Sequence, residues 1–321
     1  MSNKYNILLI ALICFLLGIF LSSSIYLIAG TINSKDRNMT KAIKLSKEAA
    51  GFQSKKQYTK AIELYKKSVN LYPELVSNHY ALGYLFVKIG KYEKAIEEYN
   101  TALVISPTYS DAIYGLAKVY YDNGLYDRAI QEYKKVVELS PLNSGAYNNL
   151  GLAYFKLNNL EESVKNYEQA IKIDNKNEKA YNNLGMVYYK MGLFDEALYH
   201  YKKALDILPA FAEAHTNMGI VKFQMGMFRE ALEDFDTAIS SNKKYPEPHK
   251  YIAQIYLLLG NLDNSLKHYN LYIKKSPDAL DKADILNQIN NITNKINQIN
   301  VAQETKTILD VEEETNKTFQ D

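Results

Sequence analysis

The chain has 321 residues, of which 47% are hydrophobic and 23% are charged, and its formal net charge is +2. This is the composition of a globular protein, and it excludes a wholly disordered or fibrous chain. A single cysteine excludes an intramolecular disulfide, and the near-neutral charge argues against a dedicated nucleic-acid binder, which needs a concentrated basic surface.

The first element is an uncharged apolar segment, residues 7–29. As a helix it would extend about 35 Å, enough to cross a hydrocarbon core of roughly 30 Å. We therefore expect residues 1–30 to form an N-terminal transmembrane helix. A cleaved signal peptide with Lys4 as its basic flank is the alternative, but the apolar segment is long for one and no clear small-residue cleavage site follows. Lipid attachment at Cys14 is a weaker alternative, because bulky Ile13 precedes it.

The charges beside this segment bear on its orientation. Only Lys4 and the α-amine precede it, whereas five basic residues follow it closely. Because positive charge tends to remain in the cytoplasm, the asymmetry favours a cytoplasmic main body attached to the membrane. Export of the main body is the alternative, since a lysine before an apolar run also begins many exported, anchored proteins. The five basic residues are Lys35, Arg37, Lys41, Lys44 and Lys47.

After a linker at residues 31–41, a repeat of 34 residues organises the chain. Five prolines are separated by one or two lengths of this repeat, at Pro73, Pro107, Pro141, Pro209 and Pro277. Small residues recur at one position of each repeat, and tyrosine or phenylalanine recurs at another, always at the same interval of 34 residues. Seven units of equal length then fill residues 42–279. The expected units are 42–75, 76–109, 110–143, 144–177, 178–211, 212–245 and 246–279.

Each unit has the periodicity of two short amphipathic helices. In the fourth unit, apolar residues recur at helical spacing on both sides of a break at residues 158–159. Small residues at the Gly151 and Ser163 registers would let the paired helices approach closely. Large rings at the Tyr154 and Tyr167 registers would fill the space beside them.

This pattern resembles the tetratricopeptide repeat (TPR) family, whose units of about 34 residues carry an aromatic residue, Leu-Gly, tyrosine, alanine, a second aromatic and a closing proline. Residues 181–209 fit the pattern almost throughout, with Tyr181 in place of the usual tryptophan. The resemblance covers residues 42–279. It implies an all-α fold, a right-handed superhelical solenoid of helix-turn-helix repeats.

The sequence departs from the family pattern at a few positions. The first unit has Leu45 and Ala49 where the aromatic and the glycine belong, so its first helix is expected to be an atypical cap. Lys222 replaces the aromatic of the sixth unit. Histidines occupy the tryptophan register in three units, and we interpret them as packing residues: His79, His215 and His249.

Two segments follow the repeats. Isoleucines stepping by 4, 3, 4 and 3 residues form one stripe of a helix, so residues 280–300 are predicted to be the capping helix that a solenoid needs to cover its last apolar face. Residues 301–321 are rich in acidic side chains and are expected to be a disordered tail. The isoleucines are Ile285, Ile289, Ile292, Ile296 and Ile299.

No catalytic, metal-binding or phosphate-binding motif stands out. The histidines fall in repeat registers, Cys14 lies in the apolar segment, and the glycines mostly punctuate the repeats. The repeats also leave no room for a catalytic domain. We therefore expect a protein that is not an enzyme, has no cofactor or metal, and binds neither nucleic acid nor a small-molecule substrate.

The resemblance implies that a partner binds the inner face, which the first helices line. The sixth residue of three consecutive units is asparagine, whose amide both donates and accepts hydrogen bonds and so can hold the main chain of an extended peptide. The ninth residues are apolar and the twelfth are aromatic, which suits hydrophobic anchors of a partner. The candidate partner-binding residues are Asn149, Asn183 and Asn217, then Leu152, Met186 and Ile220, and finally Phe155, Tyr189 and Phe223.

Two interpretations of this surface stay open, because asparagine is common at the sixth position of the family and some of the rings could serve only to stack between helices. A chaperone-type carboxylate clamp is not expected, since no unit has asparagine at the ninth position. The function we expect is a membrane-anchored protein–protein interaction scaffold. The alternatives are a permanent structural subunit of an envelope assembly or secretion complex, and a regulatory partner of a separately encoded enzyme.

Overall fold

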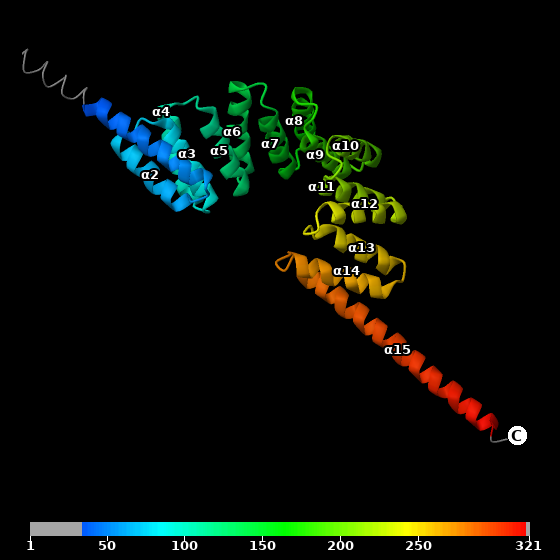
Figure 1. Ribbon diagram of the computed structural model, residues 1–321. Helices are drawn as coiled ribbons and strands as arrows, with labels where there is room; N and C mark the ends of the chain where they lie inside the picture. Colours follow the sequence, from blue (N-terminus) through cyan, green and yellow to red (C-terminus); the bar gives the residue numbers. More distant parts are fainter. Residues whose placement is uncertain (1–33, 319–321) are drawn as a thin grey trace, which may run out of the picture. The chain divides into compact units, whose positions relative to one another are not determined.

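The computed structural model describes residues 34–318, and all regular structure in that range is helical (Figure 1). The prediction of an all-α fold is therefore confirmed. The chain divides into two compact units on either side of the bond between Ala153 and Tyr154. The predicted membrane segment, residues 7–29, lies outside the described residues. Among residues 34–318, none of the helices combines the length and the apolar character that a bilayer crossing needs.

The first unit is a succession of antiparallel helices. An initial helix, residues 34–54, comes first. The helices that follow are α2 (Tyr58–Leu71), α3 (Val76–Lys88), α4 (Tyr92–Ile105), α5 (Ser110–Asp122), α6 (Tyr126–Leu139) and the greater part of α7 (Ser144–Lys156).

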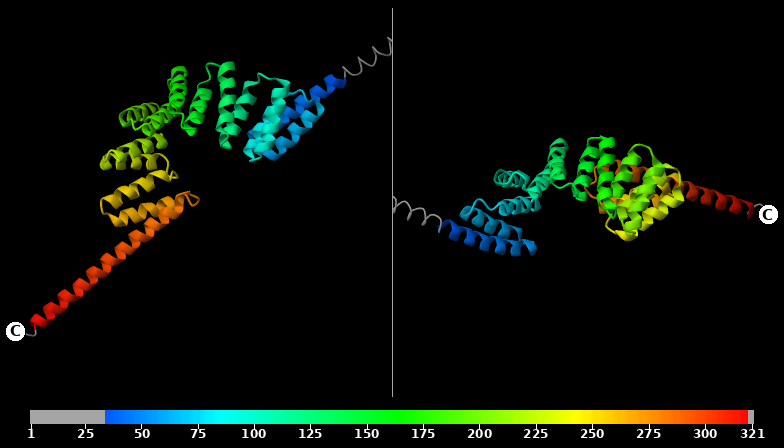
Figure 2. Two further views of the ribbon diagram at one scale, coloured as in Figure 1. Left: turned by 180° about the vertical axis from the view of Figure 1, so that it is seen from behind. Right: turned by 90° about the horizontal axis from the view of Figure 1, so that it is seen from above.

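The second unit contains the last turn of α7 and the further helices α8 to α15. Short helices again alternate up to a long final helix that extends beyond its neighbour, drawn in orange and red (Figures 1 and 2). These are α8 (Leu160–Ile173), α9 (Glu178–Lys190), α10 (Phe194–Ile207), α11 (Ala212–Gln224), α12 (Phe228–Ser241), α13 (Glu247–Leu258), α14 (Leu262–Lys275) and α15 (Lys282–Thr318).

Glycine lets the two helices of a repeat touch. A Cβ atom built on Gly185 of α9 would lie 2.7 Å from Cε1 of Tyr201 on α10. The Tyr201 ring is 1% exposed, so it fills the space that the missing side chain leaves. Gly219 and Phe235 repeat the arrangement at 2.7 Å in the next repeat, with the same separation in sequence. The pairing of a small residue with a large ring is thus the packing unit of these hairpins.

Most hairpins turn through a residue in the left-handed region of backbone conformation. Gly192, between α9 and α10, has a φ of +78°, which only glycine adopts without strain. Between α7 and α8 the same place is taken by Asn158, with a φ of 61°, and asparagine tolerates this region better than most residues. Asn159 then caps α8 by accepting a hydrogen bond from the backbone N–H of Glu162.

The histidines in the tryptophan register pack as we expected and also make polar contacts across their own hairpins. Nδ1 of His79 lies 2.7 Å from the carboxylate of Glu98, and its Nε2 lies 3.0 Å from the carbonyl oxygen of Pro73. Since both ring nitrogens face acceptors, the contact with Glu98 holds the pKa of His79 above its usual value despite burial. The equivalent pairs are His215 with Asp234, at 3.6 Å, and His249 with His268, at 3.2 Å.

The structure corrects the expected linker. Residues 34–41 are helical and continue without a break into the first helix of the expected first repeat. No glycine or proline interrupts this stretch, and Lys35 forms an ion pair of 3.2 Å with Glu74 at the end of the first hairpin. The helix therefore begins before the repeat register does.

The structure also corrects the expected disordered tail. The capping helix does not stop near residue 300, because α15 continues to Thr318. Its first part packs on α14 through Ile285 and Ile292, which are 5% and 3% exposed. The stripe of isoleucines ends at Ile299, and the side chains of residues 301–307 are all exposed. No glycine or proline follows Lys282 in α15, so nothing in the sequence breaks the helix once it has begun.

Candidate functional site

An apolar pocket of about 250 Å³ opens among the first helices of the second unit. An apolar cavity of roughly 150 Å³ is enough to hold benzene, so this pocket has room for one large apolar side chain. Tyr201 is fully buried, and burial raises the pKa of its phenol well above the usual value. The pocket is lined by Phe155 of α7, Met186, Tyr189 and Lys190 of α9, Tyr201 of α10, and Asn217 and Ile220 of α11.

The rings that line the pocket are held by their neighbours. Tyr189 stacks on Phe194 with 5.9 Å between ring centres and an interplanar angle of 26°. The ammonium group of Lys190 lies 4.9 Å from the centre of the Phe155 ring, in the geometry of a cation–π contact. The aromatic wall of the pocket is therefore positioned before any partner arrives, which lowers the entropic cost of binding.

The asparagines of the sixth position connect neighbouring first helices. In the second unit, the amide of Asn217 donates a hydrogen bond of 2.9 Å to Oδ1 of Asn182, which is 5% exposed. In the first unit, the amide of Asn149 donates a hydrogen bond of 2.7 Å to the hydroxyl of Tyr114. In both cases the acceptor lies 35 residues earlier, at the fifth position of the preceding repeat. One N–H of each amide is thus used inside the protein.

The pocket gathers five of the nine candidate residues: Phe155, Met186, Tyr189, Asn217 and Ile220. Phe223 instead packs against Phe228 and Tyr251, with ring centres 5.8 and 6.0 Å apart. Asn183 is half-buried on α9 and does not line the pocket. Leu152 and Asn149 belong to the first unit, where both are half-buried.

Two lining residues were not among the candidates. Tyr201 lies one repeat of 34 residues after Tyr167, in the register expected to fill the space between paired helices, and Lys190 follows Tyr189 at the end of α9. A signal for Lys190 exists in the sequence, because it lies 35 residues after Phe155, the same offset that relates Asn217 to Asn182. An offset of one repeat plus one residue therefore marks contacts between successive first helices.

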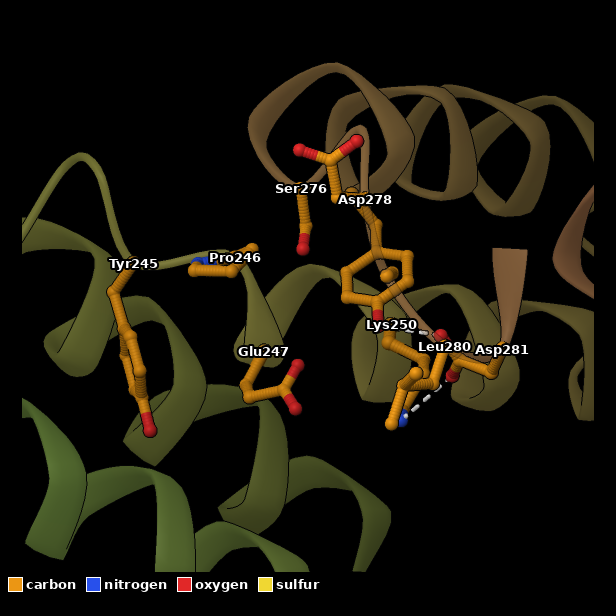
Figure 3. Close-up of a pocket in the computed structure, with 10 residues that line it drawn as sticks. Tyr245, Pro246, Glu247, Lys250, Ser276, Asp278, Leu280 and Asp281 are labelled. Atoms are coloured by element: carbon orange, nitrogen blue, oxygen red, sulfur yellow. Dashed lines mark hydrogen bonds and ion pairs between the residues drawn. The ribbon is translucent and has the colours of Figure 1, made fainter. Parts of the chain in front are cut away.

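A larger hollow of about 720 Å³ lies where α13, α14 and the loop before α15 meet (Figure 3). Its central polar groups already pair with one another. The Lys250 ammonium lies 3.0 Å from one carboxylate oxygen of Asp281, and the Tyr272 hydroxyl donates a hydrogen bond of 2.7 Å to the other. Glu247 and Ser276 also line the hollow.

This network fastens the beginning of α15 to the last repeat. Burial opposes ionisation of Asp281, but the hydrogen bonds from Tyr272 and Lys250 outweigh it and hold the pKa of its carboxyl below the usual value. Because the hollow is wide and its central charges are compensated, we assign it a structural role. Within residues 34–318, no group of three or more His, Cys, Asp or Glu side chains could hold a metal ion.

Comparison with known families finds tetratricopeptide repeats along the chain. Models described as TPR repeat match residues 83–124, 118–158 and 151–192. Others described as tetratricopeptide repeat match residues 45–75, 178–211 and 216–279. Among curated proteins, none matches this chain significantly.

Solved structures share the fold. A tetratricopeptide repeat protein from Parabacteroides merdae is 17% identical, with a TM-score of 0.67 over 79% of this chain and 99% of that chain. Cut9–Hcn1, an APC/C hetero-tetramer, gives 19% identity and a TM-score of 0.63 over 75% of this chain and 48% of that chain. This chain thus spans about half the length of that one. For pilF of Pseudomonas aeruginosa the identity is 18% and the TM-score 0.56, over 66% of this chain and 97% of that chain.

Proposed function

Because the chain belongs to the tetratricopeptide repeat family, we propose that it is a membrane-tethered interaction scaffold that holds a segment of a partner protein against its first helices. The observation that carries this proposal is the apolar pocket between α7, α9 and α11. Repeat arrays of this kind use the face lined by one set of helices as an extended binding surface. The pocket would supply the local feature that a specific partner requires.

The pocket would take one bulky apolar side chain of the partner. Met186 offers a flexible aliphatic contact, Ile220 a stiffer branched one, and the rings of Phe155 and Tyr189 offer flat walls. Such a half-open, largely apolar recess resembles the packed pockets in which interface hot spots occur. Methionine also adapts its shape to different side chains, so leucine, methionine and phenylalanine are all suitable anchors.

The main chain of the partner would lie beside the anchor. The amide of Asn217 uses one N–H on Asn182, whereas its carbonyl oxygen accepts no hydrogen bond within the described residues. That oxygen can accept from a backbone N–H of an extended segment. The asparagine of the sixth position would then have two simultaneous roles, one between repeats, as observed, and one toward the partner.

The tether proposed is the apolar segment at residues 7–29, and we place the repeats on the cytoplasmic side from the excess of lysine and arginine that follows it. Fusion of a reporter that is active on one side of the membrane only, placed after Asp321, tests this orientation. Activity of a reporter that works only outside the cytoplasm would reverse it. Release of the chain from membranes by salt alone would argue against the tether.

The partner proposal is tested by photo-crosslinking in intact cells. A photoreactive residue in place of Met186 is expected to capture a defined protein through one segment. A matched residue in place of Tyr199, which is 56% exposed on α10 away from the pocket, serves as the control. Equal capture from both positions, or none from Met186, would contradict the proposal. A captured complex that survives detergent and high salt at fixed stoichiometry would indicate a permanent structural subunit instead.

A further inference from the structure

The rim of the apolar pocket carries positive charge without a carboxylate beside it. Lys190 is exposed, lies over the Phe155 ring, and forms no ion pair with any described carboxylate. None of the residues that line the pocket is acidic.

A lysine near this position in the next repeat behaves differently. Lys222 of α11 is turned inward, and its ammonium lies 2.7 Å from the carboxylate of Asp234, which is 7% exposed. That charge is therefore compensated inside the protein. The helix dipole favours a lysine at the carboxyl end of any helix, so the position of Lys190 and Lys222 near their helix ends does not by itself indicate a binding role. What distinguishes Lys190 is its place over a ring that lines an apolar recess.

We propose that the pocket selects an extended partner segment in which a bulky apolar residue is accompanied by an aspartate or glutamate two residues away. This inference rests on the proposed function, because it names the chemistry of the segment that the pocket holds. In an extended segment, residues two apart project from the same side and lie about 6–7 Å from each other. A carboxylate placed there reaches the rim while the apolar side chain fills the recess, and its charge complements Lys190.

The exposure of the Lys190 ammonium group determines how much affinity the acidic residue of the partner can add. A cation held against an aromatic face loses part of its hydration, yet Lys190 remains exposed to solvent. Exposed ion pairs contribute modestly, so the acidic residue is expected to raise affinity about two- to fivefold at low salt. The gain should shrink as salt rises from about 0.1 M to about 1 M, because the Debye length falls from about 10 Å to about 3 Å.

The test begins with the full chain in detergent micelles and a displayed library of random dodecapeptides. Peptides that bind are synthesised with their acidic residue intact or replaced by the matching amide, and their affinities are measured by fluorescence anisotropy. We expect Lys190→Gln to abolish the difference in affinity between the acidic peptide and its amide form, so the readout is the ratio of the two affinities in each variant. Lys190→Glu should reverse the preference toward lysine or arginine. The matched control is Lys202→Gln, an exposed lysine of α10 outside the pocket, which should change nothing.

The possible outcomes distinguish a failure of this inference from a failure of the proposed function. Peptides that lose affinity with Met186→Ala but show no preference for the acidic residue would overturn the inference and leave the pocket as a partner site. An acidic preference that persists in Lys190→Gln would also overturn it. Selected peptides that ignore Met186→Ala altogether would contradict the proposed function, and the inference with it.

Discussion

The contact between Gly185 and Tyr201 makes a sharp prediction about stability. Gly185→Ala adds one methyl group at a point 2.7 Å from Cε1 and 2.8 Å from Cδ1 of the tyrosine ring, distances at which real Cβ atoms are essentially never found. The ring cannot withdraw into solvent, because it is buried and packs with Ala197 and Val221. The helices α9 and α10 must therefore separate or the ring must leave its rotamer.

The magnitude follows from a comparison of two identical substitutions. Gly51 lies in the initial helix, exposed, and a Cβ built on it meets nothing within 4 Å. Gly51→Ala should therefore raise stability by about 0.5–1 kcal/mol, the gain in helix propensity. Gly185→Ala gains the same propensity but incurs an overpacking cost of about 1–3 kcal/mol. The difference between the two variants isolates that steric cost.

Native-state hydrogen exchange is the suitable assay, because a repeat array opens locally and each hairpin reports its own free energy of opening. Amides of α9 and α10 should exchange faster in Gly185→Ala, whereas amides of the initial helix should exchange more slowly in Gly51→Ala. If both variants slow exchange equally in their own helices, the close approach at Gly185 is wrong and the hairpin packing argued from it fails.

Three further predictions follow from polar contacts. Asn217→Ala leaves the buried carbonyl oxygen of Asn182 without its donor, so local stability should fall by about 1–3 kcal/mol; unchanged exchange in α9 and α11 would contradict this. Burial and the neighbouring His268 lower the pKa of His249 from 6.5 to about 4. Between pH 6.5 and 4 the unfolded chain therefore binds more protons than the folded chain, and the free energy of unfolding should fall as the pH drops through this range. His249→Tyr should make stability depend less steeply on pH, as measured by thermal melts at several pH values. An unchanged pH dependence would show that another group causes it. Asp281→Asn should speed hydrogen exchange of the backbone amides at the start of α15 and leave those of α9 unchanged. If the amides of α15 exchange as slowly as in the original protein, Asp281 does not fasten this helix.

Much of the fold could be predicted because the repeat fixes which residues meet. Gly185 and Tyr201 recur in two registers at a constant separation, and a small residue facing a ring has few structural explanations other than close helix packing. The polar partners of the histidines could also have been predicted from the repeat. His79 with Glu98 and His215 with Asp234 share a spacing of 19 residues, which is the step from the first helix to the facing position on the second.

The end of the chain could not be predicted in the same way. The isoleucine stripe stops at Ile299, and an acidic sequence without an apolar face favours disorder by composition. The helix nevertheless continues to Thr318, because propagation adds one hydrogen bond for each residue once a packed nucleus exists. The nucleus here is the contact of Ile285 and Ile292 with α14.

The sequence indicates which helix face carries the candidate residues, but not how they meet in space. The structure brings Met186, Tyr189 and Ile220, from the ninth and twelfth positions, together around one recess, and their contact with a partner stays a prediction. Sequence alone did not reveal that Asn217 uses an N–H on its neighbour, because that hydrogen bond depends on how successive first helices are offset. The charge over the recess was missed for the same reason, since Lys190 meets Phe155 only across that offset.

The central claim is that the pocket of the second unit holds a partner segment, and one affinity ratio tests it most directly. The segment captured from position 186 would be synthesised and titrated against Met186→Ala and against Met225→Ala, whose methionine is 42% exposed and lies outside the pocket. Truncation of an anchor contact commonly costs about 1–2 kcal/mol, so Met186→Ala should weaken binding roughly five- to thirtyfold while Met225→Ala leaves it unchanged. Equal affinities for the two variants would show that the segment binds elsewhere.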